Sequence, residues 1–278
     1  MTTYTAPAAG IVARPTSGAN FLTATAQSAR RTMLQYLRTP QLLVMPVILA
    51  AAFLIIFRYI FGGAIHTGSA TDYTDFLIPG FLVQTTLWTG MNTPAGIAED
   101  STSGVHDRFR SLPIPRSTVM AGRSLADAAL SCWALLVVTL LGFAVGFRTD
   151  ANLPAIVLAF ALMVAMIYAF TWVFIYLGLL AGNAQAAQGI SSLVVIPLDF
   201  VSGAFVPIRS MPSWIRPFAA NQPVNVIINA VRSLLLGGAK NAGIGHSSAY
   251  WVALSLAWCA GILIVFSSVA VARFARPR

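Results

Sequence analysis

The stretch from residue 153 to residue 180 is almost entirely apolar and contains no charged side chain. About 20 apolar residues suffice for a helix to cross the hydrocarbon core of a bilayer. Other long apolar stretches recur along the chain, and only 9% of its 278 residues are charged. So few charges could not cover a surface that faces water. The sequence therefore predicts an all-α polytopic membrane protein and excludes a soluble globular fold.

Six transmembrane helices are expected, within one membrane domain over residues 40–278. The predicted spans lie at about 41–61, 76–98, 119–147, 153–180, 187–207 and 248–274. The third is longer than one crossing requires, so we expect it to begin as a cytoplasmic helix. An even number of spans places both termini on the same side.

The N-terminal region divides into two parts. Residues 1–20 are rich in Thr, Ala, Pro and Ser and contain no long apolar run, so we expect a disordered cytoplasmic tail without a cleavable signal peptide. In residues 21–39, apolar side chains recur at helical spacing between arginines, which predicts an amphipathic interfacial helix. The alternative is a disordered basic segment that acts only as a topology signal.

The positive charges indicate an orientation. If the N-terminus is cytoplasmic, eleven of the 17 Lys and Arg residues fall on the inner side and six on the outer side. Cytoplasmic loops carry such an excess, so we expect a multi-pass protein of the cell (plasma) membrane with both termini cytoplasmic. The same distribution accounts for the net charge of +9, and no nucleic-acid partner is expected.

Residues 99–116 are charged and too long for a simple turn. Phe109 and Leu112 lie among the arginines Arg108 and Arg110. Apolar anchors with a charged rim are typical of a short helix that docks in a groove of a partner. The alternative is a solvated loop whose arginines only enforce the topology.

Two motifs carry a resemblance to a known family. The run Asp-Arg-Phe-Arg-Ser-Leu-Pro-Ile-Pro-Arg at 107–116, followed by Ala-Gly-Arg at 121–123, resembles the first cytoplasmic loop of type-2 ABC exporter permeases. The segment 202–223 and Arg-Ser-Leu-Leu-Leu-Gly at 232–237 resemble the C-terminal signature of the same family. Within it, the chain is most similar to the daunorubicin/doxorubicin-resistance subgroup of drug and lipid exporters.

This resemblance implies a permease subunit that is surrounded by membrane lipid and moves an amphipathic drug or lipid out of the cell. It implies a partner ABC ATPase dimer, which binds ATP and Mg, and a second permease copy or a sibling permease. The chain has no Walker A loop, so we expect no cofactor on it and no enzymatic activity of its own. The expected ATPase-coupling residues are Asp107, Arg108, Phe109, Arg110 and Leu112.

The segment before the last span is expected to form short extracellular re-entrant helices that cap the outer mouth of the path. Its prolines interrupt the backbone, and its aromatic residues favour the membrane interface. The alternative is an ordinary outer loop. The expected gate residues are Pro207, Met211, Pro212, Trp214, Pro223 and Arg232.

Asp127 and Asp199 are the only acidic residues inside apolar segments. Ionisable groups at membrane depth are unfavourable unless they are paired or face water. Asp127 is expected to pair with Arg123 one turn earlier. Asp199 is either a helix-end acid near the outer headgroups or part of a substrate path. The residues assigned to that path are Asp199, Ser202, Gly203 and Phe205.

Two other functions stay open. A polysaccharide-export ABC permease would share the fold, and a proton-driven secondary transporter would show an inverted repeat with several buried carboxylates. The three histidines are scattered, so no metal site is expected. Cys132 and Cys259 lie in different apolar segments and are interpreted as packing residues.

Overall fold

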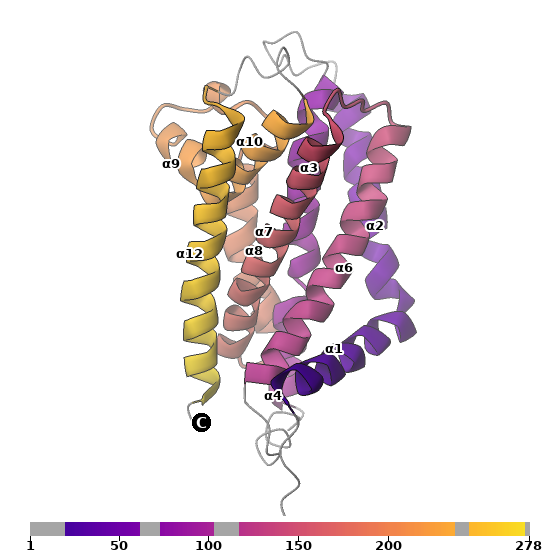
Figure 1. Ribbon diagram of the computed structural model, residues 1–278, viewed down its shortest axis with the longest axis vertical. Coiled ribbons are helices and arrows are strands. Elements are labelled where there is room, and N and C mark those ends of the chain that lie inside the picture. The colour runs from indigo at the N-terminus through magenta and orange to yellow at the C-terminus, as the bar shows by residue number, and fades with distance from the viewer. Residues whose placement is uncertain (1–19, 62–72, 103–116, 237–244, 276–278) are drawn as a thin grey trace, which may run out of the picture.

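The computed structural model describes residues 20–61, 73–102, 117–236 and 245–275, and every regular element in these ranges is a helix. The long helices run side by side along the long axis of the molecule (Figure 1). The elements are α1 (Phe21–Arg38), α2 (Pro40–Ile55) with a π-helical continuation (Ile56–Phe61), α3 (Tyr73–Gly90), α4 (Thr93–Thr102), α6 (Ser117–Ala144), α7 (Leu153–Leu180), α8 (Ala184–Phe200), a 3-10 turn (Ile208–Ser210), α9 (Arg216–Asn221), α10 (Pro223–Leu235) and α12 (Ser248–Ala275).

Among the described residues, four helices are long and apolar enough to cross a membrane. They are Pro40–Ile60, Met120–Ala144, Leu153–Leu180 and Ser248–Phe274. Many apolar side chains of α2 and α12 point outward, including Met45, Ile48 and Ile264. A helix that is apolar on all sides is suited to a lipid environment. The chain is therefore a multi-pass membrane protein.

Three of the predicted spans differ from the observed helices. The stretch 76–98 is divided, because α3 ends at Gly90 and α4 begins at Thr93 after a turn. Pro94 stands in the first turn of α4, where the amide proton that proline lacks is not needed. The stretch 187–207 is helical only as far as Phe200, since the following residues form irregular backbone held by side chains from other elements.

The predicted span 119–147 also ends early. Helix α6 stops at Ala144, and the chain turns at Gly146, whose φ of 108° is rarely adopted by residues with a side chain. The short turn to α7 then closes with Asn152, whose side-chain oxygen accepts a hydrogen bond from the amide of Ala155 and so caps α7.

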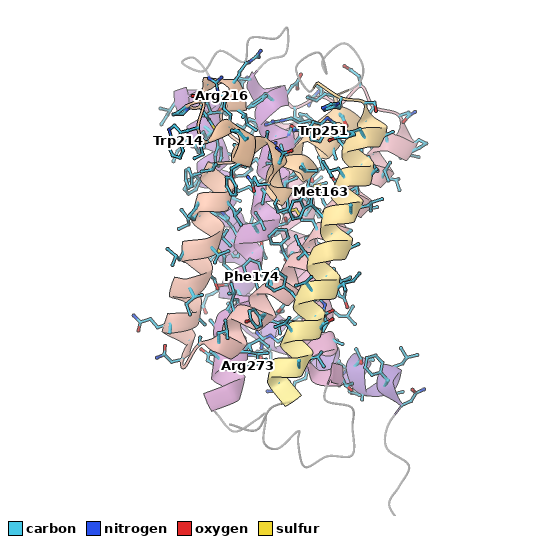
Figure 2. All side chains as sticks on the ribbon, turned by 90° about the vertical axis from the view of Figure 1, so that its left-hand side faces the viewer. Met163, Phe174, Trp214, Arg216, Trp251 and Arg273 are labelled. Carbon is cyan, nitrogen blue, oxygen red and sulfur yellow. The ribbon has the colours of Figure 1, made fainter. Side chains whose placement is uncertain are left out.

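Helix α7 is the centre of the bundle and contacts α12, α4, α10 and α6. Phe174 and Met163 lie at its buried face (Figure 2). Two glycines allow close approach there. A Cβ on Gly90 of α3 would lie 2.4 Å from the Phe174 ring, and a Cβ on Gly178 of α7 would lie 2.7 Å from the carbonyl oxygen of Pro94. These glycines fix how near α3 and α4 come to α7.

Helix α1 lies across the lower end of the bundle, which is also the end of α4 and of the C-terminal part of α12, whereas α9 and α10 lie at the opposite end (Figure 1). Helix α1 packs against α6, and the hydroxyl of Tyr36 on α1 donates a hydrogen bond to Oδ1 of Asp127 on α6. Nε of Arg123 lies 3.5 Å from Oδ2 of Asp127, which confirms the predicted pairing. Burial and the Asp127 carboxylate raise the pKa of Tyr36, so its hydroxyl remains a donor.

The glycine contacts lead to a stability prediction. Gly178→Ala should destabilise the protein by about 1–3 kcal/mol, because the new methyl group meets backbone that cannot rotate away. Gly261→Ala on α12 is the matched control, since a Cβ there has nothing within 4 Å. Heating both variants in detergent, followed by size-exclusion chromatography, measures the difference. Equal losses of the monodisperse peak would contradict the packing described for α7 and α4.

Candidate functional site

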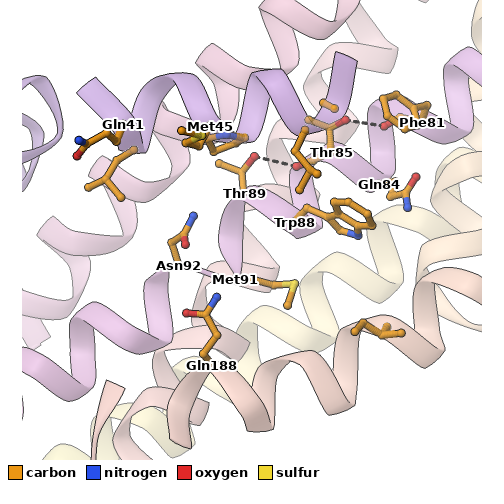
Figure 3. A pocket seen from close by; sticks show the side chains of 15 residues that line it. Gln41, Met45, Phe81, Gln84, Thr85, Trp88, Thr89, Met91, Asn92 and Gln188 are labelled. Carbon is orange, nitrogen blue, oxygen red and sulfur yellow. Dashed lines mark hydrogen bonds between the residues drawn. The ribbon is translucent and has the colours of Figure 1, made fainter. Parts of the chain in front are cut away.

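A pocket of about 490 Å³ lies between α2, α3 and α8 (Figure 3). Its volume falls within the ~300–1,000 Å³ typical of small-molecule sites. Apolar side chains form most of its lining together with several uncharged polar ones, and no charged residue is among the described ones that line it. The lining residues are Gln41, Leu42, Met45, Pro46, Leu49, Ala50, Phe81, Gln84, Thr85, Trp88, Thr89, Met91, Asn92, Gln188 and Ile196.

The threonines of α3 contribute little free donor capacity to this pocket. The hydroxyl of Thr85 donates to the carbonyl oxygen of Phe81, and that of Thr89 donates to the carbonyl oxygen of Thr85, both at 2.8 Å (Figure 3). The amides of Gln41, Asn92 and Gln188 are the side-chain donors that line the rest of the pocket. The pocket therefore suits a largely apolar molecule with a few polar groups.

Asp199 lies directly behind the pocket wall. Nε2 of Gln84 donates to its Oδ2 at 2.5 Å, and Nε1 of Trp88 donates to the same oxygen at 3.0 Å. Asp199 is fully buried, and its Oδ1 and the Oε1 of Gln84 have no hydrogen-bond partner among the described residues. Helix α8 continues through Pro197 without opening. The side chain of Asp199 therefore contacts α3 and is not exposed by a break in its own helix.

Gln84 and Trp88 were not singled out in the sequence. They are one helical turn apart, which places them on the same face of α3. An amide and an indole at this spacing within an apolar stretch both need a polar partner. That pattern was the available signal, but only the packing of α8 against α3 identifies Asp199 as the partner.

The other predicted path residues form the irregular segment after α8. Ser202 donates through Oγ to the carbonyl oxygen of Asp199 at 2.5 Å, and the amide of Gly203 donates to Oδ1 of Asn225 at 3.2 Å. The Phe205 ring stacks on Phe57 with centroids 4.3 Å apart. These residues are buried and do not line the pocket, so the segment has a structural role at the end of α8.

Arg232 connects this segment to α3 and α10. Its Nε and Nη2 donate to the carbonyl oxygen of Phe76 at 3.1 and 2.8 Å, and Nη2 donates to that of Ala204 at 3.1 Å. The guanidinium also lies 3.7 Å from the centroid of the Phe76 ring. Gly80 makes room for this contact, since a Cβ there would lie 2.7 Å from the Ala204 oxygen. Arg232 therefore holds three elements together.

The remaining predicted gate residues lie around the short helices. Pro207 precedes the 3-10 turn, Met211 follows it, and Pro223 is the first residue of α10. Pro212 and Trp214 are exposed, and Trp214 is 79% accessible. An exposed tryptophan at one end of the bundle (Figure 2) is suited to the lipid headgroup region.

The predicted coupling residues lie outside the described residues. They are Asp107, Arg108, Phe109, Arg110 and Leu112. The flanking helices are described: α4 ends at Thr102 and α6 begins at Ser117. The Arg123 guanidinium of α6 is so close to Gly96 of α4 that a Cβ on Gly96 would overlap it. The two helices that flank the predicted coupling segment are therefore in direct contact.

A metal-binding cluster or a disulfide in the described part of the chain would indicate other chemistry. No cluster of three His, Cys, Asp or Glu residues that could hold a metal ion occurs among the described residues. Both cysteines are free thiols, and Cys259 is buried.

Comparison with known proteins gives the family. The model of the ABC-2 type transporter family matches residues 23–236. A daunorubicin resistance ABC transporter permease of Streptomyces coeruleorubidus is 31% identical over 250 residues, covering 90% of this chain and 85% of the relative. A probable doxorubicin resistance ABC transporter permease of Mycobacterium tuberculosis is 23% identical, covering 88% of this chain and 86% of the relative. A putative transport permease of Cyanophora paradoxa is 24% identical, covering 74% of this chain and 71% of the relative.

The family match covers most of the chain, and it includes the pocket, the irregular segment after α8 and most of the membrane helices. The relative from Streptomyces also covers most of the chain. This chain belongs to the ABC-2 type transporter family and is the transmembrane permease subunit of an ABC exporter.

Proposed function

We propose that the pocket between α2, α3 and α8 receives an amphipathic drug or lipid on its way out of the cell. The observation that carries this proposal is the composition of the pocket, which is mostly apolar with uncharged polar groups and the Asp199 carboxylate behind its wall. The names of the relatives, which mention daunorubicin and doxorubicin resistance, support a drug-like cargo. A second permease copy or a sibling permease completes the path.

The proposed topology has six spans. Besides the four long apolar helices, α3 with α4 forms a second span and α8 forms a fifth. Both lie parallel to the long helices in Figure 1, which supports this arrangement. With 17 residues, α8 is close to the ~20 residues that a crossing needs. The end of the bundle that carries α1 then faces the cytoplasm, and α9 and α10 face outward.

The energy source is a separate ABC ATPase dimer that binds ATP and Mg. We place its contact on the segment between α4 and α6, with Phe109 and Arg110 at the centre. The contact of Arg123 with Gly96 supports this role, because it links the two helices on either side of the segment. A displacement of the segment by the ATPase would therefore shift α4 and α6 together.

The proposed topology predicts the behaviour of reporter fusions. A green fluorescent protein fused after Arg278 should be fluorescent, and alkaline phosphatase at the same position should be inactive, because that end lies in the cytoplasm. Alkaline phosphatase inserted at Gly245, just before α12, should be active. An active phosphatase at the C-terminus alone would contradict the proposed orientation. Equal activity at both positions would show that α12 does not cross the membrane.

The coupling contact predicts a loss of partner binding. Phe109→Ala with Arg110→Glu should weaken co-purification of the ATPase by about 30-fold or more, since anchor residues of an interface contribute ~2 kcal/mol or more. Phe218→Ala with Arg216→Glu is the matched control, because it changes the same residue types on the exposed end near α9. Undiminished ATPase association in the first variant would contradict the coupling assignment.

The Asp199 carboxylate predicts a change in cargo preference. Asp199→Asn should lower the preference for cationic over neutral amphipathic cargos about tenfold, because two opposite unit charges ~10 Å apart attract each other by about 1.7 kcal/mol at an effective dielectric constant of ~20. Asp150→Asn removes the same charge in the exposed turn before α7 and serves as the control. Cargo-stimulated ATP hydrolysis in reconstituted vesicles measures both. An unchanged ratio in Asp199→Asn would exclude the carboxylate from cargo selection.

A further inference from the structure

Helix α1 has three distinct faces. Thr25, Thr32 and Tyr36 are buried against α6. At 100° per residue, Leu22 and Leu37 lie about a quarter turn away, and they are 71% and 60% exposed. The third face lies opposite α6 and is polar. One face thus attaches the helix to the bundle, and the second presents apolar side chains to the surroundings.

The polar face forms a shallow groove of about 440 Å³. Three of its side chains are arginines and two are glutamines, and there is no acidic residue in α1 or among the described residues that line the groove. The lining residues are Gln27, Arg30, Arg31, Leu34, Gln35, Arg38 and Thr39. Arg30 and Arg38 are exposed, so both guanidinium groups are accessible to a ligand. The charge of the groove fits an anion.

The position of the groove limits the source of that anion. Arg38 is the last residue of α1, and the apolar span begins at Pro40. Arg38 therefore lies at the boundary of the hydrocarbon core, which is where phospholipid phosphates are found. The exposed Leu22 and Leu37 beside the groove favour contact with acyl chains rather than with water.

We propose that this groove binds the phosphate of an anionic phospholipid headgroup. The planar guanidinium groups of Arg30 and Arg38 donate paired hydrogen bonds to phosphate oxygens, and the amides of Gln27 and Gln35 offer further donors. The neighbouring leucines contact the upper part of the acyl chains. A protein partner with an acidic surface is less suited, because it would contact the groove alone, whereas a phospholipid contacts both the groove and the neighbouring leucines.

The site is tested with the full chain, purified with its ATPase partner in detergent micelles. Binding of phosphatidylglycerol and of phosphatidylcholine is measured by native mass spectrometry, with inorganic phosphate as competitor. We expect phosphatidylglycerol to bind about tenfold tighter or more, and Arg30→Gln with Arg38→Gln to weaken its binding ~30-fold, since each basic residue near the surface contributes a factor of about five. Arg30→Lys with Arg38→Lys keeps both charges and should keep most of the preference.

Arg209→Gln with Arg216→Gln is the matched control, because it removes two exposed arginines at the opposite end of the bundle. It should leave phosphatidylglycerol binding unchanged. Equal binding of the two lipids, an equal loss in the control, or displacement by inorganic phosphate at matched concentration would each overturn the proposal. The proposal would also be overturned if the variant Arg30→Gln with Arg38→Gln lost the ATPase subunit but still bound phosphatidylglycerol. The comparison of the two lipids needs no variant, so it decides even if a substitution impairs folding.

Discussion

Between Phe200 and Ile208 the backbone leaves the helical pattern inside a bundle of apolar helices. Non-helical backbone at such a place is stable only if side chains satisfy its polar groups. Arg232, Asn225 and Tyr73 do so, through the carbonyl of Ala204, the amide of Gly203 and the carbonyl of Phe205. This network connects α3 and α10 to the end of α8. The shape of the end of the molecule that carries α9 and α10 depends on it.

The same network places the pocket. Because the segment after α8 is held to α3, the last turns of α8 are kept beside Gln84 and Trp88, and Asp199 comes to lie behind them. Helix α3 is in turn held against α7 by the contact of Gly90 with Phe174. One wall of the pocket is therefore part of the packed centre, whereas α2 on the other side has few fully buried side chains.

The opposite end of the molecule is organised by ionisable groups. Tyr36, Asp127 and Arg123 connect α1 to α6, and the Arg123 guanidinium reaches Gly96 of α4. A buried acid and base stabilise only when each has its partners, so these contacts constrain how α1, α4 and α6 are arranged. The proposed lipid site and the proposed ATPase contact both belong to this end. A lipid on α1 would act on helices that also flank the coupling segment.

The sequence by itself determined the fold class, because uncharged apolar stretches of span length can be read without knowing what they contact. The start of the amphipathic helix at Phe21, the end of the span at Leu180 and the pairing of Asp127 with Arg123 follow from local patterns in the same way. The break between α3 and α4, the early end of α8 and the partners of Asp199 were decided by tertiary structure. Each depends on groups that are far apart in the chain, and local patterns carry no information on which helix faces meet.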